Sequence, residues 1–115
     1  MSGEEQLHIA ARPGPDRLIL ELEGELDLVS SGLLEESLAS GDLDGSRAVV
    51  LDLRGVRFLD STGLKAIFRV RNLVREGGRQ FAVTQGSAQV QRLLSLTRLD
   101  EHLQTIDTPD AALVA

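Results

Sequence analysis

Residues 48–78 read AVVLDLRGVRFLDSTGLKAIFRVRNLVREGG, and this stretch decides the fold. Its first six residues form a nearly continuous aliphatic run, which is typical of a strand covered on both faces and therefore central in a parallel sheet. After the strand, Asp60 can cap a helix whose apolar residues recur at mostly helical spacings, with Phe68 expected to point onto the sheet. That helix should stop at Gly77 and Gly78. The stretch therefore predicts a central strand, a loop and a well-defined helix.

Two strands are expected before this unit. Leu7 and Ile9 can form one face of a short first strand, which residues 12–16 (RPGPD) must end because its two prolines lack N–H donors and its glycine favours a turn. A hairpin-like connection leads to residues 17–23, where leucines alternate with other residues, so we predict a strand with one buried face. Gly24 is expected to interrupt it.

The other elements alternate helix and strand. Residues 28–40 predict a modest helix with Asp27 available as its N-cap. The elements expected after residue 78 are a strand containing Phe81 and Val83, a helix capped by Ser87, a strand over residues 103–106 and a short final helix starting at Thr108. The whole pattern predicts an α/β fold, with a mixed, mostly parallel sheet of about five strands and about four helices packed on it.

Length and composition indicate one globular domain over residues 1–115. The chain has no cysteine, which excludes disulfide frameworks and thiolate metal sites. Its formal net charge of -6 argues against direct nucleic-acid binding, which rests on clustered cations. The first residues are acidic and polar, unlike a signal peptide, and no apolar run approaches the ~20 residues needed to cross a bilayer. We therefore expect a cytoplasmic protein without membrane insertion.

The charges are unevenly distributed. Residues 1–52 carry a net charge of -9, residues 53–79 a net charge of +5 and the remainder -2. The cations of the middle segment form a basic block made of Arg54, Arg57, Lys65, Arg69, Arg71, Arg75 and Arg79. The favoured interpretation is the solvated face of a helix, and the alternative is a surface that steers an acidic partner.

Known catalytic patterns are absent from the sequence. The two histidines, His8 and His102, stand 94 positions apart and form no metal-binding spacing. The only lysine, Lys65, is not part of a phosphate-binding loop, and neither the dinucleotide-binding pattern nor the serine elbow occurs. We therefore expect no catalytic residue, metal or cofactor, and a protein that is not an enzyme.

The segment 58–64 (FLDSTGL) lies between the central strand and the following helix. The loops after parallel strands gather at one edge of an α/β sheet, where ligands and partners bind. A phosphate on Ser61 would lie beside backbone N–H donors at the helix N-terminus. Gly63 would let another protein approach the hydroxyl closely. The alternative interpretation is an ordinary helix cap, for which Asp, Ser and Thr are common choices.

Four segments resemble the STAS domain of bacterial anti-sigma-factor antagonists: residues 24–27 (GELD), 50–56 (VLDLRGV), 58–64 (FLDSTGL) and 90–97 (VQRLLSLT). The resemblance covers residues 7–113 and implies a single STAS domain. In that family the residue after the aspartate of D-S-x-G-L is phosphorylated, which corresponds to Ser61 here, with Thr62 as its neighbour. Lys65 departs from many relatives, which carry a small residue there, so the partner surface can differ.

The resemblance implies a partner-switching cycle. The unmodified antagonist binds an anti-sigma factor with a histidine-kinase-like ATPase domain that acts as a serine kinase, and so releases a sigma factor. Phosphorylation breaks this association, and a serine phosphatase restores it. The implied partner-binding residues are Asp27, Asp60, Ser61, Thr62, Gly63 and Leu64, although Asp27 has the alternative role of a helix cap. Other possibilities are a STAS scaffold that is not phosphorylated, a transport-complex regulatory subunit and a nucleotide-binding or nucleotide-hydrolysing enzyme.

Overall fold

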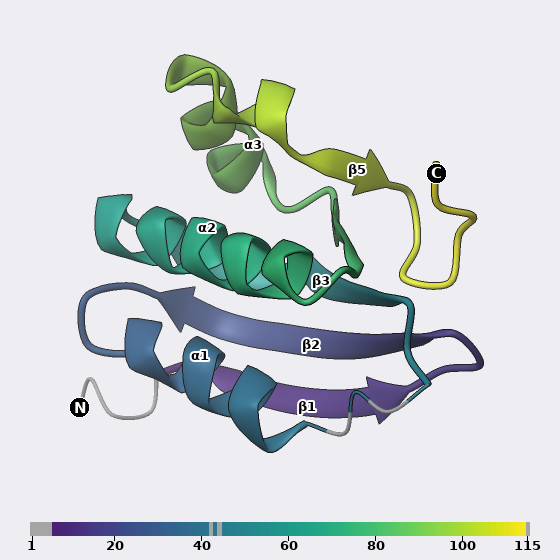
Figure 1. Ribbon diagram of the computed structural model, residues 1–115. Helices are drawn as coiled ribbons and strands as arrows, with labels where there is room; N and C mark the ends of the chain where they lie inside the picture. The colour runs from purple at the N-terminus through teal and green to yellow at the C-terminus, as the bar shows by residue number, and fades with distance from the viewer. Residues whose placement is uncertain (1–5, 42, 44, 115) are drawn as a thin grey trace.

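A computed structural model describes residues 6–41, 43 and 45–114. Its sheet has five strands in the order β1-β2-β3-β4-β5 (Figure 1). The first pair is antiparallel and the other three pairs are parallel. The strands are β1 (His8–Pro13), β2 (Arg17–Leu26), β3 (Ala48–Leu59), β4 (Gln80–Thr84) and β5 (Gln104–Ile106). The predicted mostly parallel α/β sheet is confirmed, with β3 at its centre.

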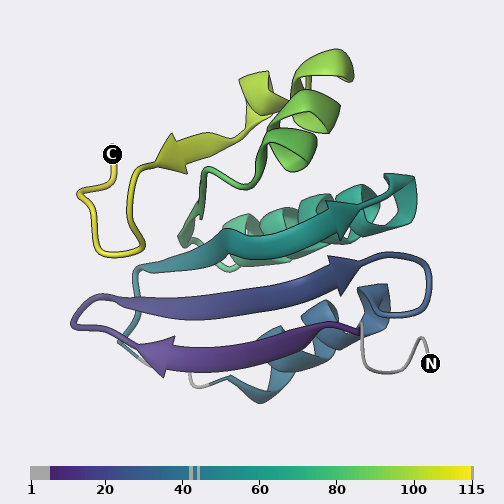
Figure 2. The ribbon, with the colours of Figure 1, turned by 180° about the vertical axis from the view of Figure 1, so that it is seen from behind.

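The described residues also form three α-helices and one 3-10 helix. The sequence predicted about four helices. They are α1 (Ser31–Ser40), α2 (Ser61–Glu76), α3 (Ala88–Leu96) and the 3-10 helix η2 (Leu99–His102). Helices α1 and α2 cover one face of β1, β2 and β3, and the opposite face of these strands is seen in front in Figure 2. The larger buried cluster lies between the helices and the sheet and includes Leu20, Leu51 and Ile67.

Strand β2 differs from the prediction in two ways. Ile19 is as deeply buried as Leu20, because it packs with Val50 and Ile106 in a second cluster that also contacts Ala111 and Leu113. Gly24 does not end the strand, which continues to Leu26. Instead, Gly24 adopts a φ of +114° where the register between β2 and β3 shifts, so it forms an irregularity inside the strand.

The predicted short helix at Thr108 is wrong. Residues 108–110 form a turn, with the Ala111 N–H donating to the Thr108 carbonyl at 3.1 Å. The buried side chain of Arg17 donates from Nη1 to the carbonyls of Pro109 at 2.9 Å and Ala111 at 2.8 Å. Because these carbonyls accept hydrogen bonds from Arg17 of β2, they are not available for the backbone hydrogen bonds of a helix.

The predicted end of α2 and the predicted start of α3 are both confirmed. Helix α2 ends before Gly77 and Gly78, and Gly78 has a φ of +79°. Ser87 caps α3 by accepting a hydrogen bond from the Val90 N–H.

Candidate functional site

The candidate site lies where β2 and β3 end and α2 begins. The N–H of Asp60 donates to the Leu26 carbonyl at 3.4 Å. A Cβ at Gly63 would lie 2.0 Å from the same carbonyl oxygen, so glycine is required for helix α2 to sit this close to the end of β2. The backbone of Leu26 therefore joins the turn that follows β2 to the start of α2.

Asp60 is the N-cap of α2, as predicted. Its backbone is extended, and its carboxylate accepts a hydrogen bond from the Gly63 N–H at 2.9 Å. Ser61 is the first residue of the helix and is exposed, Thr62 is half-buried and Leu64 is buried. Of the two hydroxyls at this helix start, that of Ser61 is the more accessible to another protein.

Asp27 stabilises a turn and does not cap the helix that follows. Its Oδ1 accepts hydrogen bonds from the N–H groups of Val29 and Ser30, both at 3.1 Å. The prediction that Asp27 is the N-cap of α1 is wrong, because the helix begins at Ser31 and its N-cap is Ser30. The turn takes up the residues between Leu26 and α1, so the helix starts later than the apolar pattern indicated. Asp27 still belongs to the site, since it directly follows Leu26.

This turn carries exposed apolar side chains. Leu28 and Val29 are 73% and 74% exposed, and Phe58, near the end of β3, is 43% exposed. Exposed apolar side chains that gather beside a cluster of polar groups are typical of protein-binding surfaces. We call the turn residues Leu28 and Val29, together with Ser61, the switch edge.

Gln89 is a site residue that the sequence did not indicate. Its side-chain amide accepts a hydrogen bond from the Leu59 N–H and donates one to the Leu59 carbonyl, both at 3.2 Å. This paired contact fixes the end of β3 immediately before Asp60. The two residues are 30 positions apart, and a single glutamine at the start of a helix gives no local signal of such a contact.

An apolar pocket of about 320 Å³ adjoins Ser61. It is lined by Ser61, Leu64, Lys65, Phe68 and Leu99. The prediction that Phe68 points onto the sheet is wrong, because Phe68 is half-buried and lines this pocket with Leu99. The residues of α2 with no exposed surface are Ala66, Ile67 and Val70. Phe68 therefore lies on the side of α2 that faces Leu99, the first residue of η2.

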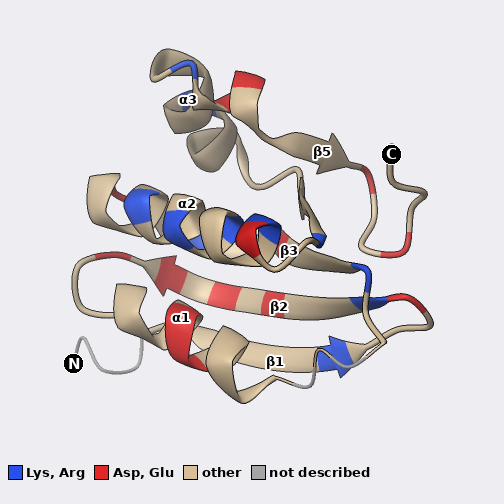
Figure 3. Cartoon of the chain, viewed as in Figure 1, with Lys and Arg blue, Asp and Glu red and all other residues tan. Residues whose placement is uncertain are grey.

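Several cations of the basic block lie on α2, which carries blue segments in Figure 3, and three arginines of the block contact other parts of the chain. Arg69 forms an ion pair with Glu35 of α1, with an Nε to Oε1 distance of 2.7 Å. Arg71 donates to the His102 carbonyl at 3.0 Å, and Arg79 donates to the carbonyls of Ser46 and Leu43, both at 3.1 Å. These arginines connect α2 and its C-terminal turn to neighbouring elements, which periodicity alone does not reveal.

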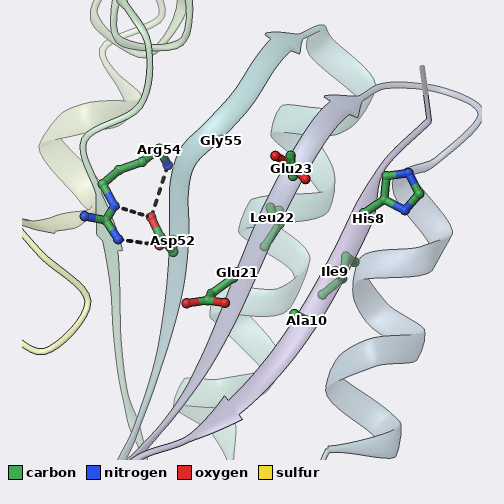
Figure 4. Close-up of a pocket in the computed structure, with 9 residues that line it drawn as sticks. All are labelled: His8, Ile9, Ala10, Glu21, Leu22, Glu23, Asp52, Arg54 and Gly55. Atoms are coloured by element: carbon green, nitrogen blue, oxygen red, sulfur yellow. Dashed lines mark hydrogen bonds and ion pairs between the residues drawn. The ribbon is translucent and has the colours of Figure 1, made fainter. Parts of the chain in front are cut away.

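A second polar cluster lies in β3 and β4, and two of its members, Asp52 and Arg54, line the pocket shown in Figure 4. Asp52 is buried and accepts hydrogen bonds from the Arg54 guanidinium, with two distances of 2.9 Å, and from the Thr84 hydroxyl at 3.0 Å. Burial opposes ionisation of Asp52, but the hydrogen bonds from Arg54 and Thr84 outweigh it and hold its pKa below the usual value. The Thr84 hydroxyl also accepts a hydrogen bond from the Leu53 N–H at 2.8 Å, so this network stabilises the centre of the sheet.

The described part of the chain offers neither a metal-binding cluster nor a membrane-spanning helix. Among those residues, no group of three or more His, Cys, Asp or Glu side chains could hold a metal ion. No helix formed by them is long and apolar enough to cross a membrane.

Comparison with known proteins gives concordant results. The STAS domain family model matches residues 7–112. The chain is 28% identical over 113 residues to the anti-sigma-F factor antagonist RsfB of Mycobacterium tuberculosis, covering 98% of this chain and 92% of that protein. It is 28% identical over 82 residues to the anti-sigma-B factor antagonist of Staphylococcus aureus, covering 71% of this chain and 76% of the relative. The crystal structure of an anti-sigma factor antagonist from Mycobacterium paratuberculosis superposes with a TM-score of 0.79 at 26% identity, covering 90% and 88% of the two chains.

Proposed function

The chain belongs to the STAS domain family, and we propose that it is an anti-sigma factor antagonist that binds its anti-sigma factor through the switch edge. The names of its relatives in Mycobacterium and Staphylococcus support this class of partner. The observation that carries the proposal is the exposed Ser61 at the start of α2, next to a turn with the exposed apolar side chains Leu28 and Val29. Such a surface offers apolar contact area around one modifiable hydroxyl.

We further propose that the anti-sigma factor is a serine kinase with a histidine-kinase-like ATPase domain and that it phosphorylates Ser61. A serine phosphatase then removes the phosphate and restores the binding form of the antagonist. Phosphate adds about -1.5 to -2 charge at neutral pH. On Ser61 this charge would stand next to the carboxylate of Asp60, in a surface whose other exposed members, Leu28 and Val29, are apolar. An interface that buries these groups would have to desolvate the added charge, so the complex dissociates.

Phosphorylation need not unfold the site. Asp60 is held by the Gly63 N–H, and the backbone beneath it is fixed through Leu26 and Gln89. An anionic group at the first turn of a helix also interacts favourably with the helix dipole. The modification therefore changes the surface and leaves the fold in place, as a reversible switch requires.

The experiment is a calorimetric titration of each Ser61 variant against the cognate anti-sigma factor. Ser61→Ala should bind like the wild type, because it removes only a small group. Ser61→Asp should weaken binding by roughly 2–5 kcal/mol, the range for leaving a charge buried without a partner in an interface. Ser95→Asp is the matched control, since Ser95 is an exposed serine of α3 that is not part of the switch edge. Equal affinities of the two Ser61 variants would refute the switch.

Two further measurements separate binding from modification. Leu28→Ala should weaken binding while Leu96→Ala does not, although both leucines are 73% exposed. Incubation with the anti-sigma factor and ATP, followed by mass mapping, should place one phosphate on Ser61. A complex that forms through Leu28 without any phosphate on Ser61 would instead identify a STAS scaffold that is not phosphorylated.

A further inference from the structure

A third pocket lies at the C-terminal end of α2, whereas the switch edge lies at its N-terminal end. It has a volume of about 410 Å³ and lies between the C-terminal half of α2, the strands β4 and β5, and His102 of η2. Its charged lining is made of Arg71, Arg75 and Arg79, with no carboxylate among the lining residues. In a chain of net charge -6, this concentration of cations needs an explanation.

Two of these guanidinium groups are fixed in position by neutral partners. Arg71 donates to the His102 carbonyl at 3.0 Å, and Arg79 donates to the Ser46 and Leu43 carbonyls, both at 3.1 Å. Carbonyl groups orient a guanidinium without neutralising its charge. The site is therefore preorganised and remains cationic, which lowers the conformational cost of binding an anion.

The side chain of Arg75 has no hydrogen bond or ion pair with any residue described in the structure, although its backbone carbonyl accepts a hydrogen bond from the Gly78 N–H at 3.0 Å. By contrast, Arg69 lies on the same helix and is paired with Glu35 at 2.7 Å. Burial, and to a smaller extent repulsion by the nearby charge of Arg75, lower the pKa of Arg71. A bound anion would relieve this repulsion.

The helix dipole accounts for only part of the positive charge. The C-terminus of a helix carries about half of one negative charge, and Arg75 lies in the last turn, where it complements that charge. The cations Arg71 and Arg79 remain in excess. Helix capping therefore explains one arginine of the cluster and leaves the other two.

We propose that the pocket formed by Arg71, Arg75 and Arg79 binds a small phosphorylated compound through its phosphate groups. Guanidinium groups bind phosphate oxygens with paired hydrogen bonds, and several of them suit a ligand with more than one negative charge. The volume is within the ~300–1,000 Å³ range of small-molecule sites. The buried ring of Phe81 gives the pocket an apolar wall that can contact the rest of such a compound.

Pyrophosphate is the probe for this site. A titration followed by amide NMR at constant ionic strength should give saturable shifts at residues that line the pocket, including Gly78 and Gln80, and none at Ser61. Arg75→Gln should bind pyrophosphate roughly tenfold more weakly, as expected for the loss of one charge-assisted contact. Arg92→Gln is the matched control, because Arg92 is exposed in α3, outside the pocket.

Arg71→Gln provides a second variant, and far-UV circular dichroism checks that it folds despite the lost contact with His102. Shifts that stay linear with pyrophosphate concentration would overturn the proposal, as would equal weakening by Arg75→Gln and Arg92→Gln. Tighter binding of a hexaglutamate peptide than of pyrophosphate would also overturn it, since the pocket would then be a protein-docking site. Because Ser61→Asp should leave pyrophosphate binding unchanged, this test is independent of the proposed switch.

Discussion

Replacing Gly63 with alanine tests how α2 is held at the switch edge. The added Cβ would lie 2.0 Å from the Leu26 carbonyl oxygen, 2.7 Å from the Leu26 carbonyl carbon and 2.9 Å from Leu59 Cδ1. Cβ atoms essentially never approach another atom within 3.0 Å, so the start of α2 must move by about 1 Å or more. The nearest atoms belong to the backbone of a buried strand residue and cannot move aside as a flexible side chain would.

The expected cost is at the upper end of overpacking effects. Such substitutions destabilise proteins by about 1–3 kcal/mol, so we expect Gly63→Ala to lower the free energy of unfolding by about 3 kcal/mol. Gly32→Ala is the matched control, because Gly32 lies in α1 and a Cβ there would meet nothing within 4 Å. In a helix alanine is favoured over glycine by about 1 kcal/mol, so Gly32→Ala should be more stable than the wild type.

Urea unfolding followed by circular dichroism at 222 nm measures both variants, since the chain has no Trp or Tyr to report by fluorescence. The two midpoints should move in opposite directions from that of the wild type. In the anti-sigma factor titration, Gly63→Ala should also bind more weakly, because its displacement moves Ser61 relative to Leu28. An unchanged midpoint for Gly63→Ala would refute the close contact between α2 and β2.

Two further substitutions test other parts of the structure. Asp52→Asn should destabilise the protein at pH 7, because the pKa of Asp52 is lowered in the folded protein. The stabilisation by ionised Asp52 is fully present above the ordinary aspartate pKa near ~3.9, and it is lost as the pH falls from that value through the lower pKa of the folded protein. Urea midpoints of the two proteins at pH 7 and pH 3 should therefore converge in acid, and a constant difference would contradict this. Phe68→Ala should cost about 1–2 kcal/mol, less than the ~3–5 kcal/mol of a fully buried phenylalanine, because its ring is half-buried beside Leu99. Thermal unfolding measures this, and a loss at the larger value would restore the prediction that Phe68 points onto the sheet.

The elements that local sequence determines were predicted well. The aliphatic run that starts at Ala48 and the helix capped by Asp60 were both found, because a buried strand and a helix N-cap depend on neighbouring residues. The alternation of Leu18, Leu20 and Leu22 placed these residues correctly in the core. In such elements the periodicity of the side chains already decides which face is buried.

The errors occur where distant residues compete with local preferences. Thr108 and the residues after it have a typical helix-start pattern, but Arg17, more than 90 positions away, holds the carbonyls of Pro109 and Ala111. Aspartate is a common helix N-cap, yet Asp27 accepts a hydrogen bond within a turn. The exposed Leu28 of this turn belongs to the candidate interface. At both points the local sequence favours a helix that the structure does not form. Such disagreements are expected where tertiary contacts or a candidate binding surface determine the backbone.

Stability and the proposed binding role rest on different residues at the switch edge. The buried and hydrogen-bonded groups beneath it, Asp60, Gly63 and Leu26, hold the backbone in one arrangement. The residues above it, Ser61 and Leu28, are exposed and contribute little to the core. Asp60, Gly63 and Leu26 already hold the backbone that carries the Ser61 hydroxyl. A charge added to this hydroxyl would therefore change the free energy of the complex without requiring a rearrangement of the free protein. The proposed switch would therefore need no second conformation of the free protein.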